Sequence, residues 1–344
     1  MFTTAVRTAA VRTGTESRHG TQDAREYGDG RDAQGGREAV RTDARPDNGP
    51  DRAARHPEAP AAPAADPAPA WRDLGVDSMA AALVVSVTRL GARSFAARCQ
   101  WPRWHPLNER ALAVTHHPLL MVETTRQLAA AVRARHLGPV GGPLPEPAAI
   151  SLGTDVRSRP TETGTATDVA ARVTLSDLRT DAGAPAFRLT AEYAHAGTVF
   201  ATCSLLFSPS TTTLAPSAPP AAPPGLLHPP AAAVGAAAEP DVLLARAAQG
   251  RLVIVPRDRA HPVLLPGAPA VLPAPAVLEA GRQAVLLSCG ATAPAVAGLA
   301  LRLHAPVPVR GAAVEVAAGR DCTRFVVLSG GTVLADGTVV LTRS

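Results

Sequence analysis

The sequence contains no lysine and few aromatic residues. All 34 basic residues are arginines, and Phe, Trp and Tyr together make up 3% of the 344 residues. A hydrophobic core must therefore be built from Ala, Val and Leu, and few rings are present to stack on nucleic-acid bases. The arginines are scattered rather than clustered, so the net charge of +5 does not indicate a nucleic-acid-binding face. We expect no nucleic-acid partner.

Long apolar runs and paired cysteines are also missing. No run of about 18 apolar residues occurs, which argues against a transmembrane helix, and the first residues lack the apolar core of a secretory signal. The four cysteines form no Cys-x-x-Cys pair, so neither a zinc site nor a disulfide framework is indicated. We therefore expect a cytoplasmic protein with no membrane partner and no metal.

Two low-complexity segments divide the chain. Residues 1–70 combine many charged, Gly, Ala and Pro residues with almost no large aliphatic ones, so they cannot offset the entropy cost of ordering. Residues 209–240 are rich in Pro and Ala, which is typical of an extended linker. We predict a disordered tail over 1–70, a linker over 209–240, and domains over 71–208 and 241–344.

One polar signature occurs in both predicted domains. In each, a His-Pro pair is followed by a Glu-x-x-Arg-Gln motif whose Glu lies 18 residues after the His. The first copy consists of His105, Glu123, Arg126 and Gln127, and the second of His261, Glu279, Arg282 and Gln283. Repetition of so specific a pattern indicates an internal repeat.

The pattern around each motif predicts the same local structure. Two short apolar runs come first, then a helix over 119–136 or 276–289, and then β-like runs separated by Gly and Asp turns. Each helix is apolar nearly all round, so it must be buried against the sheet. We therefore predict an α+β fold, a tandem hotdog in which each long helix is wrapped by a curved antiparallel sheet.

The motif residues lie on one helix face, because i, i+3 and i+4 positions are neighbours. Charges in such apolar surroundings must be paired or must face a polar cleft. One interpretation is a structural Glu–Arg pair, with the His-Pro pairs as loop elements. The other is a reactive site in which His105 and His261 lie at the mouth of a cleft and exchange protons. His117 is a further candidate, because it directly precedes Pro118 and the first helix.

Two family resemblances support the second interpretation. Residues 278–283, Leu-Glu-Ala-Gly-Arg-Gln, resemble the helix start of β-hydroxyacyl carrier-protein dehydratases, which are hotdog enzymes. More specifically, residues 100–106, 117–127, 261–262 and 279–283 resemble the A-factor biosynthesis hotdog family of γ-butyrolactone autoregulator synthases. This second resemblance covers about residues 71–344. The sequence departs from the family at His117-Pro118, where Asp-Pro is usual, and at 270–275, where Asp-His-x-Pro-Gly-Met is usual.

The A-factor resemblance implies an acyltransferase. It would move a β-ketoacyl group from a carrier-protein thioester to the hydroxyl of dihydroxyacetone phosphate, with no cofactor. The catalytic residues would be Glu123, Glu279, His105 and His261, and the substrate-binding residues Arg126, Arg282, Gln127, Gln283 and His117. The arginines suit the phosphate.

Analogy with single-domain hotdog dimers pairs each histidine with the acid of the other copy, His105 with Glu279 and His261 with Glu123. The missing polar pair before the second helix makes the two sites unequal. The alternatives are a dehydratase or thioesterase acting on acyl thioesters, and a non-catalytic member that binds an acyl ligand or a partner protein.

Overall fold

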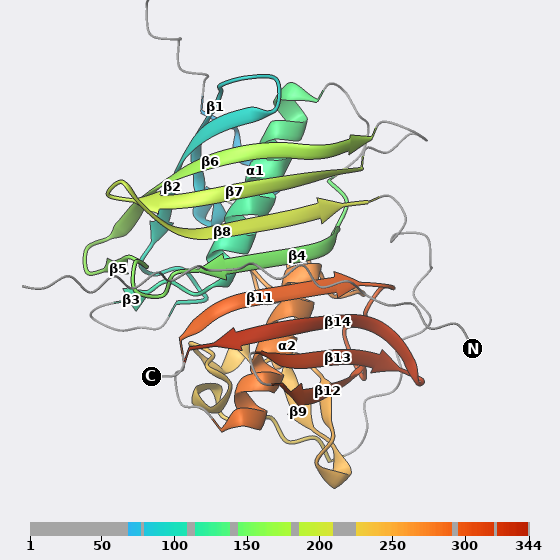
Figure 1. Ribbon diagram of the computed structural model, residues 1–344. Coiled ribbons are helices and arrows are strands. Elements are labelled where there is room, and N and C mark those ends of the chain that lie inside the picture. The colour runs from blue at the N-terminus through green and yellow to red at the C-terminus, as the bar shows by residue number, and fades with distance from the viewer. Residues whose placement is uncertain are drawn as a thin grey trace, which may run out of the picture. The chain divides into compact units, whose positions relative to one another are not determined.

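The computed structural model describes residues 68–76, 79–108, 114–137, 144–179, 186–208, 225–290, 295–319 and 322–342. The predicted disordered tail lies outside these ranges except for residues 68–70, and so does the linker up to residue 224. We call residues 68–208 the first half and residues 225–342 the second half. The predicted combination of a large antiparallel sheet with few helices is confirmed (Figure 1).

Both halves contribute six strands to one antiparallel sheet. The first half supplies β1 (Val84–Arg89), β2 (Ser94–Pro102), β4 (Pro147–Thr154), β6 (Ala166–Arg179), β7 (Ala186–His195) and β8 (Thr198–Phe207). The second half supplies β9 (Leu244–Arg246), β10 (Leu252–Ile254), β11 (Val296–Leu303), β12 (Ala313–Ala318), β13 (Thr323–Ser329) and β14 (Thr332–Leu341). A separate small sheet pairs β3 (Val114–Thr115) with β5 (Thr161–Glu162).

The strand order reveals the repeat. It runs β1-β2-β6-β7-β8-β4-β11-β14-β13-β12-β10-β9, so the two halves have the same connectivity when each is followed inward from its own edge. They meet where β4 pairs antiparallel with β11, and Ser151 lies opposite Ala300 at the centre of this pairing. The sequence analysis did not predict β4, the strand that joins the first half to the second.

One long helix packs on each half. The first, α1 (Leu119–His136), has the predicted bounds, and the second, α2 (Ala274–Cys289), begins two residues earlier than predicted. Each helix contacts strands of its own half, and the two helices also contact each other (Figure 1). The strands present alternate residues to them, as in β7, where Leu189, Ala191 and Tyr193 are buried. No described helix is long and apolar enough to cross a membrane.

Part of the predicted linker belongs to the folded second half. Within it, the 3₁₀ helix η5 (Ala231–Val234) contacts α2, and Val234 is fully buried. A further 3₁₀ helix, η6 (Glu239–Asp241), follows it. The predicted linker over 209–240 is therefore wrong for residues 225–240. These small apolar residues pack because α2 offers them a surface, which composition alone does not reveal.

Candidate functional site

The two Glu-x-x-Arg-Gln motifs form nearly identical hydrogen-bond networks. In the first half, Glu123 accepts from Arg126 Nε and Nη2 at 2.9 and 2.8 Å and from Gln127 Nε2 at 2.9 Å. In the second half, Glu279 accepts from Arg282 Nε and Nη2 at 2.8 and 2.7 Å, and from the glutamine Nε2 at 2.9 Å. Each carboxylate is therefore held by a bidentate guanidinium on its own helix.

Both arginines also fasten the preceding chain to the helix. Arg126 Nη2 donates to the carbonyl of Gly75 at 3.0 Å, and Arg282 Nη2 donates to that of Gly235 at 2.7 Å. Each glycine ends a 3₁₀ helix, η1 (Trp71–Leu74) or η5, in the left-handed conformation, with φ of 64° and 59°. The networks therefore fix where the chain enters each half.

The two glutamines anchor backbone groups. Gln127 donates to the carbonyl of Ala81 at 2.9 Å and accepts from the amide of Leu83 at 2.8 Å. Gln283 bonds Asp241 and Leu243 in the same way, at 2.8 and 2.9 Å. Both side chains are fully buried. The amide groups of Gln127 and Gln283 therefore satisfy buried backbone groups, and their predicted role in substrate binding stays a prediction.

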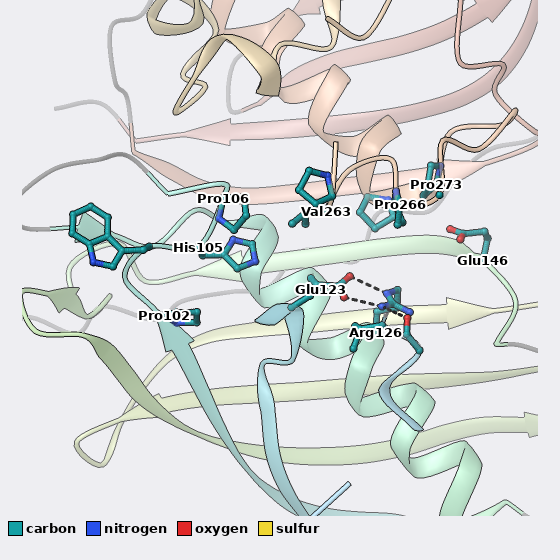
Figure 2. Close-up of a pocket in the computed structure, with 16 residues that line it drawn as sticks. Pro102, His105, Pro106, Glu123, Arg126, Glu146, Val263, Pro266 and Pro273 are labelled. Carbon is teal, nitrogen blue, oxygen red and sulfur yellow. Dashed lines mark hydrogen bonds and ion pairs between the residues drawn. The ribbon is translucent and has the colours of Figure 1, made fainter. Parts of the chain in front are cut away.

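The two sites differ in exposure. The side chains of Glu123 and Arg126 are 14% and 21% exposed, whereas those of Glu279 and Arg282 are 3% and 4% exposed. Only the first pair lines the described cavity of about 710 Å³, whose wall also includes residues of the second half (Figure 2). That wall includes Trp104, His105, Pro106, Glu146, Pro262, Val263, Pro266, Pro273 and Pro275. Arg282 does not line this cavity, and its predicted substrate-binding role stays a prediction.

His105 faces this cavity beside Glu123 (Figure 2). Its Nδ1 accepts a hydrogen bond from the amide of Leu107 at 3.3 Å, which leaves the proton of the neutral ring on Nε2. Burial lowers the pKa of His105 to about 4, although the charge of Glu123 opposes this shift. At neutral pH His105 is therefore an uncharged hydrogen-bond donor.

Glu123 is an anion under the same conditions. Burial alone would raise the pKa of its carboxyl group. The charge of Arg126 and the hydrogen bonds from Arg126 and Gln127 outweigh burial, and the pKa is lowered. The described cavity thus brings together a carboxylate that accepts protons and an imidazole N–H that donates a hydrogen bond.

His261 occupies the position in the second half that His105 occupies in the first, but both of its ring nitrogens are engaged. Nε2 lies 2.8 Å from Oδ1 of Asp241, and Nδ1 accepts from the amides of Val263 and Leu264 at 3.2 and 2.9 Å. The equivalent of Asp241 in the first half is Ala81, which also receives the glutamine hydrogen bond. Because Ala81 has no side-chain acceptor, it does not hold His105 in this way.

The predicted cross-pairing of His105 with Glu279 and of His261 with Glu123 stays a prediction; His105 lines the cavity with Glu123 of its own half, and His261 bonds Asp241. The histidine that crosses is His117, whose Nε2 lies 3.7 Å from Oε2 of Glu279. Burial lowers the pKa of His117 to about 3, so the contact is not an ion pair at neutral pH. The contact between α1 and α2 accounts for this, because it places His117, just before α1, beside Glu279 of α2.

The residue just before each helix differs between the two sites. His117 lies six residues before Glu123, and Pro273 lies six residues before Glu279. Pro273 lines the cavity that also includes Glu123, whereas His117 lies directly against Glu279. A histidine thus contacts the second carboxylate, whereas the equivalent position on the other copy is a proline, which has no side-chain donor.

The sequence analysis missed a polar network that supports the first site. Asn108 donates to His116 Nδ1 at 3.0 Å and to the carbonyl of Pro102 at 3.2 Å, and it accepts from the amide of His117 at 2.9 Å. His116 Nε2 lies 2.7 Å from Oγ1 of Thr167. The network joins the His105 loop to the start of α1. No repeat signal marks it, because Leu264 and Leu272 occupy the equivalent positions.

Glu146 was also missed. It belongs to the first half, lines the cavity, and accepts a hydrogen bond from the amide of Ala274 at 3.0 Å (Figure 2). Among the residues that the structure describes, no group of three or more His, Cys, Asp or Glu side chains is arranged to hold a metal ion.

No protein-family model and no curated protein sequence matches the chain. Among solved structures, the dehydratase domain from the terminal module of the rifamycin polyketide synthase is 16% identical, covers 76% of this chain and 95% of that chain, and gives a TM-score of 0.44. A protein of Novosphingobium aromaticivorans assigned as a thioesterase is 13% identical, with 75% and 98% covered and a TM-score of 0.43. A MaoC-like dehydratase from Phytophthora capsici is 13% identical, with 58% and 72% covered and a TM-score of 0.34.

Proposed function

We propose that the chain is a tandem hotdog enzyme that transfers the acyl group of a thioester to an oxygen nucleophile at a single site, the one in the first half. The observation that carries the proposal is the pairing of an anionic Glu123 with a neutral, N–H-donating His105 on one cavity wall. The cavity of about 710 Å³ is large enough for an acyl chain and part of its thioester arm. The repeat of a long helix on an antiparallel sheet supports the fold assignment.

Each group has one task. Oε2 of Glu123 accepts a hydrogen bond from Arg126 Nε, and its second lone pair accepts the proton of the attacking hydroxyl. The new C–O bond forms while Nε2–H of His105 donates to the carbonyl oxygen, where negative charge develops. The C–S bond then breaks, and the proton held by Glu123 passes to the departing thiolate.

The same groups are less suited to dehydration. A dehydratase must protonate a departing hydroxyl group. Glu123 is held as an anion by Arg126 and Gln127, and the lowered pKa of His105 leaves little of its acidic form at neutral pH. Acyl transfer therefore fits these protonation states better than loss of water.

Water and alcohols are both possible acceptors. Water would make the chain a thioesterase. The sequence resemblance to the A-factor family favours dihydroxyacetone phosphate, with a β-ketoacyl carrier protein as donor. That assignment needs a cation for the phosphate, and the candidate in the cavity, Arg126, already holds Glu123 and the carbonyl of Gly75.

The test uses the full chain with β-ketoacyl thioesters of coenzyme A and of a carrier protein, with and without dihydroxyacetone phosphate, and identifies the products by mass. We expect free acid or acyl ester, and a loss of about 10²–10⁴-fold in Glu123→Gln. Glu279→Gln is the matched control and should keep the activity wherever it folds. Enoyl products, an unreacted thioester with folded protein, or an equal loss in both variants would contradict the proposal.

A further inference from the structure

We propose that Glu146 determines which acceptors the first site takes. It excludes anionic acceptors, so the acceptor is water or an uncharged alcohol. This inference rests on the proposed acyl transfer at the same site and adds the substrate class. Glu146 is not part of the repeated Glu-x-x-Arg-Gln motif.

Glu146 lies at the start of α2. Glu146 directly precedes β4. Its Oε2 accepts a hydrogen bond at 3.0 Å from the amide of Ala274, the first residue of α2. The amides at the start of a helix are a natural binding place for a phosphate or carboxylate, because they point outward and carry a partial positive charge. Here a carboxylate of the protein itself occupies that place.

The residue after Ala274 offers no hydrogen-bond donor at the start of α2. Pro275 has no amide hydrogen, and the amides of Ala276 and Val277 bond the carbonyl of Pro273. The start of α2 thus presents its amides to Glu146 and to its own backbone. An anionic group of an acceptor would have to displace Glu146 to reach them.

The cavity wall contains more acidic groups than cationic ones. Glu123 and Glu146 are its two acids and Arg126 is its arginine, while His105 is neutral because burial lowers its pKa to about 4. The guanidinium of Arg126 pairs directly with Glu123. Burial raises the pKa of the Glu146 carboxyl, while the amide of Ala274 and the more distant charge of Arg126 oppose this shift, so one cation serves two acids. Figure 2 shows Glu146 on the far side of the Glu123–Arg126 pair from His105. A phosphate entering here would meet net negative charge, which costs binding energy.

The second half provides the contrast. Ala295, which directly precedes β11, takes the equivalent place to Glu146 and carries no charge. At the start of α1, the amide of Leu119 is bonded at 3.3 Å by the neutral ring of His117. The acid at the helix start is therefore a feature of the first site and not of the repeat.

The experiment compares two acceptors that differ only in their phosphate, dihydroxyacetone and dihydroxyacetone phosphate, with one β-ketoacyl thioester as donor. The wild-type chain should favour dihydroxyacetone. Glu146→Gln removes the charge but keeps an oxygen for the Ala274 amide, so it should fold. It should raise the rate with the phosphate relative to the rate without it by about tenfold or more. Glu146→Asp keeps the charge and should keep the wild-type ratio.

Glu192→Gln removes the same charge from an exposed position on β7, outside the cavity wall, and should leave the ratio unchanged. Titration with inorganic phosphate, followed by calorimetry, tests the inference without any turnover: Glu146→Gln should bind phosphate more tightly than the wild-type chain. An unchanged acceptor ratio together with unchanged phosphate affinity would overturn the role of Glu146. Failure to consume any thioester, with the phosphate effect present, would instead overturn the proposed acyl transfer alone.

Discussion

Glu123 and Glu279 receive the same hydrogen bonds from their own helices, yet 14% of one side chain is exposed and only 3% of the other. The difference arises outside the helices. Ala81 takes the place of Asp241, which bonds His261, and Pro273 takes the place of His117, which contacts Glu279. The repeat has kept the bonds that hold the backbone together, while the residues that control access to the carboxylate have diverged.

The two cores differ in a matched way. In the second half, Phe325 lies opposite Gly337 in the sheet and against Gly281 of α2, and an added Cβ on either glycine would lie 2.3 Å from the ring. In the first half the corresponding cross-strand pair is Ala191 and Cys203. Small and large residues have thus changed together, because each core must be filled without overlap.

The largest expected effect is on the free energy of unfolding, which should fall by different amounts when each of the two ion pairs is broken. Arg282→Met leaves Glu279 buried without its cation, and we expect it to lower the free energy of unfolding by about 3–5 kcal/mol. Arg126→Met should cost roughly half as much or less, because solvent reaches Glu123 from the cavity. Urea denaturation of both variants measures the difference. Equal losses would contradict the account of one open and one closed site.

A substitution that makes the first site like the second tests the role of the histidines. In Ala81→Asp, the new carboxylate should bind Nε2 of His105 as Asp241 binds His261, and the catalytic rate should fall about tenfold or more. The reciprocal variant, Asp241→Ala, should leave the rate unchanged and cost about 1–3 kcal/mol of stability, because His261 loses a buried partner. A wild-type rate in folded Ala81→Asp would show that the N–H of His105 is not used.

The smallest effect is a dependence of stability on pH. Burial lowers the pKa values of His105 and His116 to about 4 and that of His117 to about 3 from the ordinary 6.5. Below pH 6.5 the unfolded chain therefore binds more protons than the folded chain, and the free energy of unfolding should fall as the pH drops toward 4. His117→Gln should reduce this slope in denaturation experiments at several pH values. A slope identical to that of the wild-type chain would contradict the buried, neutral state of His117.

Much of the scaffold follows from sequence pattern. The bounds of α1 were predictable because apolar residues surround its polar motif and Pro118 precedes it. β4 was not, because its short run of small residues beside Gly and Pro looks like a loop until β8 and β11 pair with it on both sides. The ordering of residues 225–240 likewise depends on the surface of α2.

Which residues share the cavity was predictable in part, but their contacts were not. The repeat identified His105, Glu123 and Arg126, which do lie together. It could not show that Asp241 holds His261, or that His117 rather than His105 approaches Glu279, because the partners are distant in sequence and absent from the other copy. Divergence at single positions leaves no trace in a repeat pattern.

Ligand stoichiometry tests the central claim most directly. A non-hydrolysable thioether analogue of a β-ketoacyl-coenzyme A can be titrated into the chain by calorimetry. We predict one molecule bound per chain, and loss of binding in Val263→Trp, which fills the cavity of the first site. Two molecules bound per chain, or one that still binds after the cavity is filled, would contradict a single open site.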